Sequence, residues 1–180
     1  TYAYSSPTEI GKLFDLTGKN AMIIGGAGGL GKLVAQGLAE CGANVAIASR
    51  TESKLQAACE ELKALTGKEF KYYVCDANDE EAVAAVAKQS NEEMGHIDIL
   101  INSQGTNVKK PLFDFPVDEF NKVLQDDITS LMITCKHFGK YMADRHDGKI
   151  VNVTSVRGKI ATKGPGNAAY CASKGAVDML

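Results

Sequence analysis

A tyrosine and a lysine near the end of the chain could carry out acid–base chemistry together. Tyr170 and Lys174 lie four positions apart in a segment predicted to be helical over residues 168–180, so they share one helix face. A tyrosine phenol is a poor base at neutral pH, but a nearby ammonium favours the phenolate. Ser155 directly follows a predicted strand, and its hydroxyl could polarise a carbonyl oxygen. The three side chains suggest proton transfer to a substrate oxygen, although a Tyr–Lys pair also occurs in helices by chance.

A glycine-rich segment, I-G-G-A-G-G-L-G at residues 24–31, is the second chemical signal. It joins an apolar strand predicted at residues 20–24 to a helix predicted at residues 30–41, whose apolar face would contain Leu30, Val34, Leu38 and Cys41. Glycine lets the backbone approach a pyrophosphate, and the N-terminus of a helix offers free N–H groups. Strand, turn and helix in this order favour a dinucleotide site, with a purely structural turn as the alternative.

The end of the second predicted strand, residues 44–48, bears on the choice of cofactor. A carboxylate there would accept a hydrogen bond from the 2′-hydroxyl of NAD, but the chain has Ser49 and Arg50 and no acidic residue before Glu52. Arg50 can form a charge-assisted pair with a 2′-phosphate, and Ser49 can hydrogen-bond to it. We therefore expect NADP(H) to be favoured over NAD(H). The alternative is that Arg50 is a solvated cation at the start of a helix.

Strands and helices alternate along the chain. Further strands are predicted at residues 70–74, 97–101 and 149–153, further helices at 51–65, 78–94 and 117–145, and loops at 102–116 and 154–167. Each strand is apolar nearly throughout, which is typical of a parallel sheet covered by helices on both faces. The sequence therefore predicts an α/β protein with a doubly wound parallel sheet, the Rossmann fold, whose ligands bind at the carboxyl edge.

Composition is that of an ordinary globular protein. The 180 residues suffice for one domain, with 44% hydrophobic and 23% charged residues and a net charge of −2. No basic block suggests nucleic acid, and no apolar run approaches the roughly 18–20 residues of a membrane span. The five cysteines and three histidines lack metal-ligand spacing. We expect free thiols, no metal, no nucleic-acid or membrane partner, and a cytoplasmic location.

In this order the motifs resemble those of the short-chain dehydrogenase/reductase family, from about residue 16 to residue 180. The glycine-rich segment matches T-G-x-x-x-G-x-G with Ile24 in place of threonine, residues 102–105 (N-S-Q-G) match N-N-A-G with two departures, and residues 170–174 (Y-C-A-S-K) match Y-x-x-x-K. Asp76 matches the aspartate that contacts the adenine. The resemblance, with the reasoning above, implies a cofactor site made of Gly25, Gly29, Leu30, Gly31, Ser49, Arg50, Asp76, Ala77, Asn102, Gly105, Tyr170 and Lys174.

The resemblance also implies catalytic roles. Tyr170 would be the acid/base toward the substrate oxygen, Lys174 would favour its phenolate and bind the nicotinamide ribose, and Ser155 would orient the carbonyl. A hydride would pass between the nicotinamide and the carbinol carbon. The fourth member of the family's catalytic set is an asparagine that holds a relay water, and Asp127 stands at its position. A carboxylate could hold that water, but its negative charge would disfavour a nearby phenolate.

The stretch around Asp127 and the loop at Lys109 resemble a branch of the family that acts on sugar acids such as gluconate. Lys109 could meet a substrate carboxylate; the alternative is a solvated loop. We expect an NAD(P)-dependent oxidoreductase acting on a secondary alcohol or ketone, including a sugar acid, and forming a homodimer or homotetramer as family members do. The alternative function, suggested by Asp127, is a catalytically weak or inactive dinucleotide-binding protein that senses or scaffolds.

Five strands are predicted, whereas a doubly wound dinucleotide fold has about six. The chain also ends within its last predicted helix. We therefore expect the strand at residues 149–153 to leave an unpaired edge. Residues 1–180 are expected to form a single dinucleotide-binding catalytic domain that is incomplete at its C-terminal end.

Overall fold

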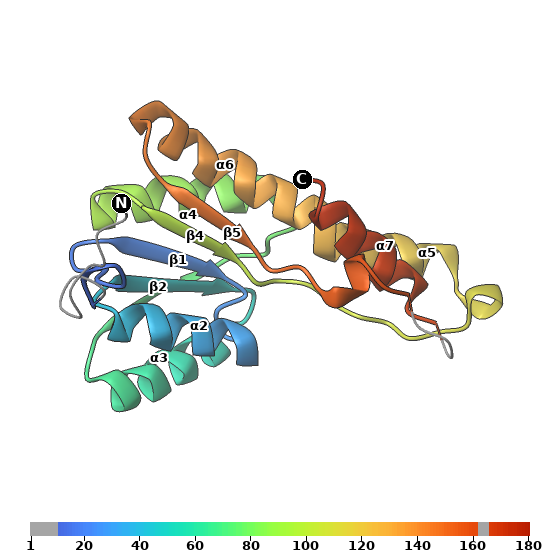
Figure 1. Cartoon of the computed structure of the whole chain (residues 1–180), viewed down its shortest axis with the longest axis horizontal. Coiled ribbons are helices and arrows are strands. Elements are labelled where there is room, and N and C mark those ends of the chain that lie inside the picture. The colour runs from blue at the N-terminus through green and yellow to red at the C-terminus, as the bar shows by residue number, and fades with distance from the viewer. Residues whose placement is uncertain (1–10, 162–165) are drawn as a thin grey trace, which may run out of the picture.

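A computed structural model describes residues 11–161 and 166–180, and its centre is a five-stranded parallel sheet (Figure 1). The strands are β1 (Asn20–Ile24), β2 (Asn44–Ser49), β3 (Phe70–Val74), β4 (Ile99–Asn102) and β5 (Lys149–Asn152), in the order β3-β2-β1-β4-β5. The chain moves outward from β1 to β3 and then crosses back to place β4 on the other side of β1. This reversal confirms the predicted doubly wound sheet and puts a crevice at the carboxyl ends of β1 and β4.

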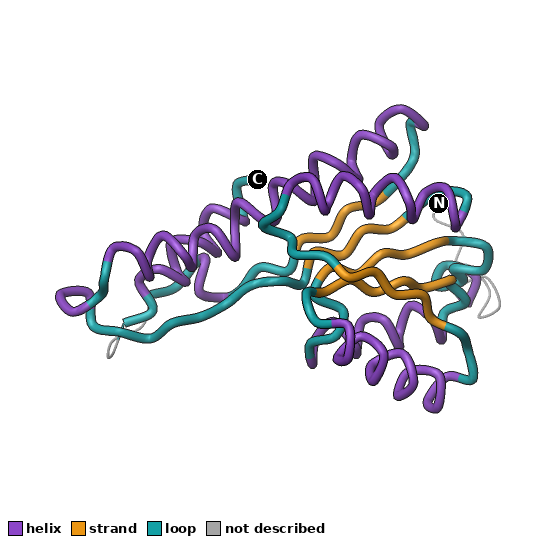
Figure 2. Tube along the Cα trace, turned by 180° about the vertical axis from the view of Figure 1, so that it is seen from behind, coloured by secondary structure: helices purple, strands orange, loops and turns teal. Residues whose placement is uncertain are grey.

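Alternate residues of each central strand point to opposite faces of the sheet. In β1, Ala21 and Ile23 pack with the buried side chains of α2 (Gly29–Glu40) and α3 (Glu52–Thr66). Met22 and Ile24 pack instead with those of α4 (Glu80–Met94) and α6 (Ser130–Arg145). Because successive side chains of a strand point to opposite faces, a strand that is covered on both sides must be apolar throughout. Figures 1 and 2 show the two helical layers.

The face that α2 presents to the sheet differs from the predicted one. Its buried residues are Gly31, Ala35 and Ala39, while Leu30 is 54% exposed and Cys41 is exposed. Val34 and Leu38 are partly buried beside this stripe and pack against the core. Small residues face the sheet because the glycine turn holds the start of α2 close to it, and larger side chains would not fit there.

The region predicted as one long helix, residues 117–145, is divided in the structure. An α-helix, α5 (Val117–Leu124), is followed by a single π-helical turn, η2 (Gln125–Thr129), and then by α6. A π-helical turn inserts one extra residue per turn and often marks a functional site. Here it carries Asp127, which is fully buried.

The two predicted loops each contain a short 3₁₀ helix, η1 (Leu112–Asp114) and η3 (Val156–Gly158). Part of the second predicted loop, residues 162–165, lies outside the described residues, as does most of the polar N-terminal stretch. The last helix, α7 (Ala168–Val177), packs against η3, η2 and α5. Figures 1 and 2 show α5 and α7 side by side, extending beyond the carboxyl edge of the sheet.

Strand β5 has the unpaired edge that the sequence predicts. Within the described part of the chain it is hydrogen-bonded to β4 alone, and its Val151 is 50% exposed. Among the same residues, no helix combines the length and the apolar character needed to cross a membrane.

Candidate active site

The glycine-rich turn between β1 and α2 is packed so closely that two of its glycines are required by the protein itself. Gly25 has φ +79°, and a Cβ there would lie 2.9 Å from the backbone nitrogen of Gln104. A Cβ on Gly31 would overlap the Gly25 carbonyl oxygen and lie 2.8 Å from Gly26 Cα. The turn is tied to the end of β2, because Gly25 donates to the Ala48 carbonyl at 2.8 Å.

Gly29, the first residue of α2, is different. A Cβ at this position would meet no protein atom within 4 Å, and its φ lies outside the left-handed region. The protein's own packing therefore does not require glycine at position 29. A glycine at an open helix N-terminus leaves space for a ligand to approach the backbone, which fits a phosphate over this turn.

A hollow of about 350 Å³ lies beside this turn at the carboxyl edge of the sheet. The residues around it come from the ends of β1, β2, β3 and β4 and from η2 and α6. Six of the predicted cofactor residues line it: Gly25, Ser49, Arg50, Asp76, Ala77 and Gly105. The other six, Gly29, Leu30, Gly31, Asn102, Tyr170 and Lys174, do not line it.

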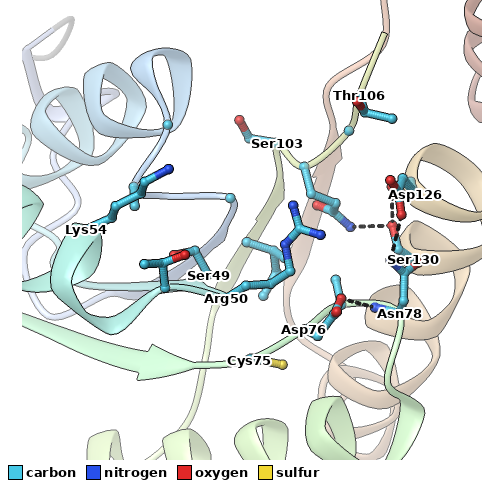
Figure 3. A pocket seen from close by; sticks show the side chains of 18 residues that line it. Ser49, Arg50, Lys54, Cys75, Asp76, Asn78, Ser103, Thr106, Asp126 and Ser130 are labelled. Carbon is cyan, nitrogen blue, oxygen red and sulfur yellow. Dashed lines mark hydrogen bonds between the residues drawn. The ribbon is translucent and has the colours of Figure 1, made fainter. Parts of the chain in front are cut away.

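One side of the hollow is cationic. Figure 3 shows Arg50 and Lys54 on either side of Ser49, just after β2 and in the first turn of α3. Neither Arg50 nor Lys54 has a carboxylate within 4 Å among the described residues. An unpaired guanidinium and ammonium around one hydroxyl suit an anion such as a phosphate. Sequence reasoning missed Lys54, although its position four residues after Arg50 at the start of a helix was a usable signal.

The opposite side of the hollow carries carboxylates and amides. Asp76 Oδ1 accepts from the Asn78 backbone N–H at 3.0 Å, and the Asn78 amide donates to Asp126 Oδ1 at 2.7 Å (Figure 3). Gln104, from the loop after β4, lies with its amide nitrogen 3.5 Å from Ser130 Oγ. Sequence reasoning missed Asn78, Gln104, Asp126 and Ser130 as lining residues. No local pattern connects them, because they come from different elements.

Asn102 has a structural position at the end of β4. It is fully buried, its side-chain amide nitrogen donates to Asn152 Oδ1 at 2.9 Å, and its side-chain Oδ1 accepts from the Thr134 hydroxyl at 2.8 Å. It therefore joins the ends of β4 and β5 to α6. This contact fixes the sheet edge from which the loop at residues 103–106 departs.

The Tyr–Lys pair lies on one face of α7, as the spacing predicts. The Lys174 ammonium is 5.7 Å from the centroid of the Tyr170 ring and donates to the Val153 carbonyl at 3.0 Å. Lys174 is only 4% exposed, whereas Tyr170 is half-buried. Burial lowers the pKa of Lys174, and the negative charge of Asp127 opposes this effect. The arrangement places a buried cation next to a phenol that solvent can reach.

Ser155 lies just after β5, in the segment that packs against α7. It is half-buried, and its hydroxyl accepts from the Arg157 backbone N–H at 3.2 Å, which caps η3. Within the described part of the chain, the Ser155 hydroxyl donates to no acceptor. Lys109, in contrast, is exposed in the loop after β4 and does not line the hollow.

Asp127 lies next to the Tyr–Lys pair with both carboxylate oxygens in use. Oδ1 accepts from the Thr106 backbone N–H and Oδ2 from the Ser173 hydroxyl, each at 2.6 Å. Its side chain is fully buried.

Within residues 11–161 and 166–180, no group of three or more histidine, cysteine, aspartate or glutamate side chains could hold a metal ion.

Comparison with known proteins agrees with this geometry. Residues 19–180 match the family model for short chain dehydrogenases. The chain is 36% identical over 169 residues to the 2-dehydro-3-deoxy-D-gluconate 5-dehydrogenase of Formosa agariphila, covering 93% of this chain and 63% of that protein. It is 35% identical over 173 residues to the gluconate 5-dehydrogenase of Gluconobacter oxydans, covering 93% of this chain and 64% of that protein. It thus spans less than two thirds of each relative.

Solved structures show the same fold. The crystal structure of a gluconate 5-dehydrogenase from Burkholderia cenocepacia, in complex with NADP and tartrate, has a TM-score of 0.85 and 32% identity, covering 92% of this chain and 64% of that one. A short-chain type dehydrogenase/reductase from Mycobacterium marinum has a TM-score of 0.88 and 33% identity, covering 92% of this chain and 67% of that one. With its glycine turn, its cleft at the sheet edge and its Tyr–Lys helix, the chain belongs to the short-chain dehydrogenase family.

Proposed function

We propose that this protein is an NADP(H)-dependent oxidoreductase that interconverts a secondary alcohol and a ketone. The observation that carries the proposal is that a cationic cleft and a buried lysine beside a solvent-accessible tyrosine lie at the same edge of one sheet. The cleft suits a phosphorylated nucleotide, and the Tyr–Lys pair suits proton transfer to an oxygen.

The residues present fit a dinucleotide. Its pyrophosphate would lie over the turn at Gly25 and Gly29, against the N-terminus of α2, and its 2′-phosphate would meet Arg50 and Ser49. The NADP complex of a relative supports this cofactor. When bound, the nicotinamide would supply or accept a hydride at the substrate carbon.

The protein's own residues would manage the proton. Tyr170 would donate its phenolic proton to the substrate oxygen during reduction and accept it back during oxidation. The Lys174 ammonium, held by the Val153 carbonyl, would stabilise the phenolate that results. Ser155 would donate a hydrogen bond to the same substrate oxygen and so polarise the carbonyl.

A sugar acid is the substrate class that we propose. The support comes from relatives named as dehydrogenases of gluconate and of 2-dehydro-3-deoxy-D-gluconate. Lys109 could pair with the carboxylate of such a substrate, since it forms no ion pair among the described residues.

We further propose a homodimer or homotetramer in the cytoplasm. The five free thiols support a reducing compartment.

The proposal is tested on the full-length protein by following the absorbance of the reduced nicotinamide. The substrates are 5-keto-D-gluconate with NADPH, and gluconate with NADP⁺, within a wider panel of alcohols and ketones. Tyr170→Phe should lower turnover by at least about a hundredfold while NADPH still binds, because only the transferable proton is lost. Tyr141→Phe, on the exposed surface of α6, is the matched control and should leave turnover unchanged.

Full turnover by Tyr170→Phe would contradict the proposed mechanism. Saturable NADPH binding without turnover on any member of the panel would instead favour a dinucleotide-binding protein that senses or scaffolds.

A further inference from the structure

Asp127 connects three segments that are far apart in the sequence. Its carboxylate lies in η2, accepts from the backbone of Thr106 in the loop after β4, and accepts from Ser173 on α7. Both bonds are 2.6 Å long, which is short for hydrogen bonds. The side chain is 0% exposed, so both oxygens lie in the interior of the protein.

Lys174 carries the opposite charge nearby. A Cβ built on Gly105 would lie 2.8 Å from Asp127 Oδ1 and 3.5 Å from Lys174 Nζ, so the two charged atoms flank the same glycine. A buried ammonium without a counter-charge is costly and tends to lose its proton. The Asp127 carboxylate opposes that loss.

We infer that Asp127 is a positioning residue that braces α7 through Ser173 and holds the Lys174 ammonium, charged, beside Tyr170. This inference rests on the proposed function and deepens it. It assigns the Asp127 carboxylate to contacts within the protein, with the Thr106 backbone N–H and the Ser173 hydroxyl.

Two substitutions separate the bracing contact from the charge. Ser173 has one hydroxyl proton, and its oxygen lies 2.6 Å from Asp127 Oδ2 and 2.9 Å from the Tyr170 carbonyl. In Asp127→Asn, the new amide can donate to Ser173 while Ser173 donates to the Tyr170 carbonyl, so the contact survives and the charge is lost. In Ser173→Ala, the contact to α7 is lost and the charge remains.

The groups around Asp127 determine how pH should act. On α7, the titratable side chains are Tyr170, Cys171 and Lys174. In η2, the neighbouring Asp126 is paired with Lys122 at 2.5 Å and faces the nucleotide cleft. The loop after β4 and the end of β5 contribute only backbone groups, from Thr106 and Val153.

Loss of the Asp127 charge should therefore favour the neutral amine of Lys174, because the carboxylate no longer opposes the effect of burial. The variant should then lose the ammonium, and with it alcohol oxidation, at a lower pH than wild type, so the high-pH side of the profile should shift to lower pH.

The test compares pH profiles of kcat for the full-length protein with gluconate and NADP⁺. Asp127→Asn should shift the high-pH side of the profile to lower pH, and Ser173→Ala should keep the wild-type profile while kcat falls about tenfold, as expected for one lost hydrogen bond to a charged group. Asp127→Ala should show both effects. KM for NADP⁺ should change less than kcat in all three, because neither Asp127 nor Ser173 lines the nucleotide cleft.

Two control variants carry the same substitutions elsewhere. Ser90→Ala removes a fully buried helical serine that donates to the carbonyl three residues before it, and Asp98→Asn neutralises a buried carboxylate at the opposite edge of the sheet. Neither should move the pH profile. A wild-type profile in Asp127→Asn, or an unchanged kcat in both Ser173→Ala and Asp127→Ala, would overturn the inference. Turnover by the wild-type protein is measured before any variant is compared. If the wild type shows no turnover, the proposed function itself is wrong.

Discussion

The contrast between Gly29 and Gly31 gives a sharp prediction, because the same substitution should have opposite effects two residues apart. Gly31→Ala places a Cβ into the Gly25 carbonyl and 2.8 Å from Gly26 Cα. These are backbone atoms that cannot rotate away, so the cost should reach the upper end of the usual range for overpacking, about 3 kcal/mol. Gly29→Ala meets no atom within 4 Å. Its stability should be equal to wild type or higher by up to about 1 kcal/mol, the helix-propensity difference between alanine and glycine.

NADP(H) binding should be affected by Gly29→Ala even though its stability is not reduced. Gly29→Ala should fold normally and yet weaken NADP(H) binding at least about tenfold, because the new methyl occupies the space where a phosphate would approach the start of α2. Denaturant unfolding gives the stability of each variant, and titration of NADPH fluorescence gives its affinity. Wild-type affinity in a normally folded Gly29→Ala would refute the placement of the pyrophosphate over this turn. Wild-type stability of Gly31→Ala would refute the packing argument.

Three further predictions concern cofactor choice, thiol reactivity and pH. Arg50→Ala should weaken NADP(H) binding by about 1–3 kcal/mol and NAD(H) binding much less, since only the former has a 2′-phosphate; equal losses in calorimetric titration would contradict the assignment. A thiol reagent should label the exposed Cys41 quickly and Cys75 slowly, because burial raises the pKa of Cys75 to about 11. Bound NADP(H) should slow the labelling of Cys75 further, because Cys75 lines the cleft. Hydrogen bonds, first among them that from Gln89, hold the pKa of Glu93 below its ordinary value of 4.5. The ionised Glu93 therefore stabilises the folded protein above that pH, and this stabilisation is lost as pH falls through the lowered pKa of the folded state. Glu93→Gln should therefore be less stable than wild type at pH 7, and the difference in unfolding midpoint should narrow in acid; a constant difference would show that ionisation of Glu93 is not involved.

The strands could be located to within about two residues because the central strands are buried on both faces, although the fourth was predicted at residues 97–101 and lies at Ile99–Asn102. Residues 20–24 are apolar apart from Asn20, and all five are buried in the structure. The glycine turn could also be predicted, since its glycines lie within a few residues of one another between an apolar strand and a helix. The end of α3 could be predicted from a glycine as well: the helix ends at Thr66, and Gly67 caps it in a left-handed conformation with φ +70°.

The packed face of α2 and the π-helical turn could not be predicted. Hydrophobic spacing assigned Leu30 and Cys41 to the core, but the distance between helix and sheet decides whether large or small side chains fit there. The turn at Gln125–Thr129 has ordinary helical composition, and only its packing against α7 and the loop after β4 distinguishes it.

The fold class, the glycine turn and the Tyr170–Lys174 pair could be read from the sequence, because each shows itself as a pattern of residues close along the chain. Only the tertiary structure decided what surrounds them. Lys54, Asn78 and Asp126 reach one cleft from separate elements, and Asp127 meets Ser173 across 46 positions of sequence. Such contacts cannot be predicted from the spacing of residues in the sequence. They depend on the twist of the sheet and on the length and path of each loop that returns the chain to the same edge.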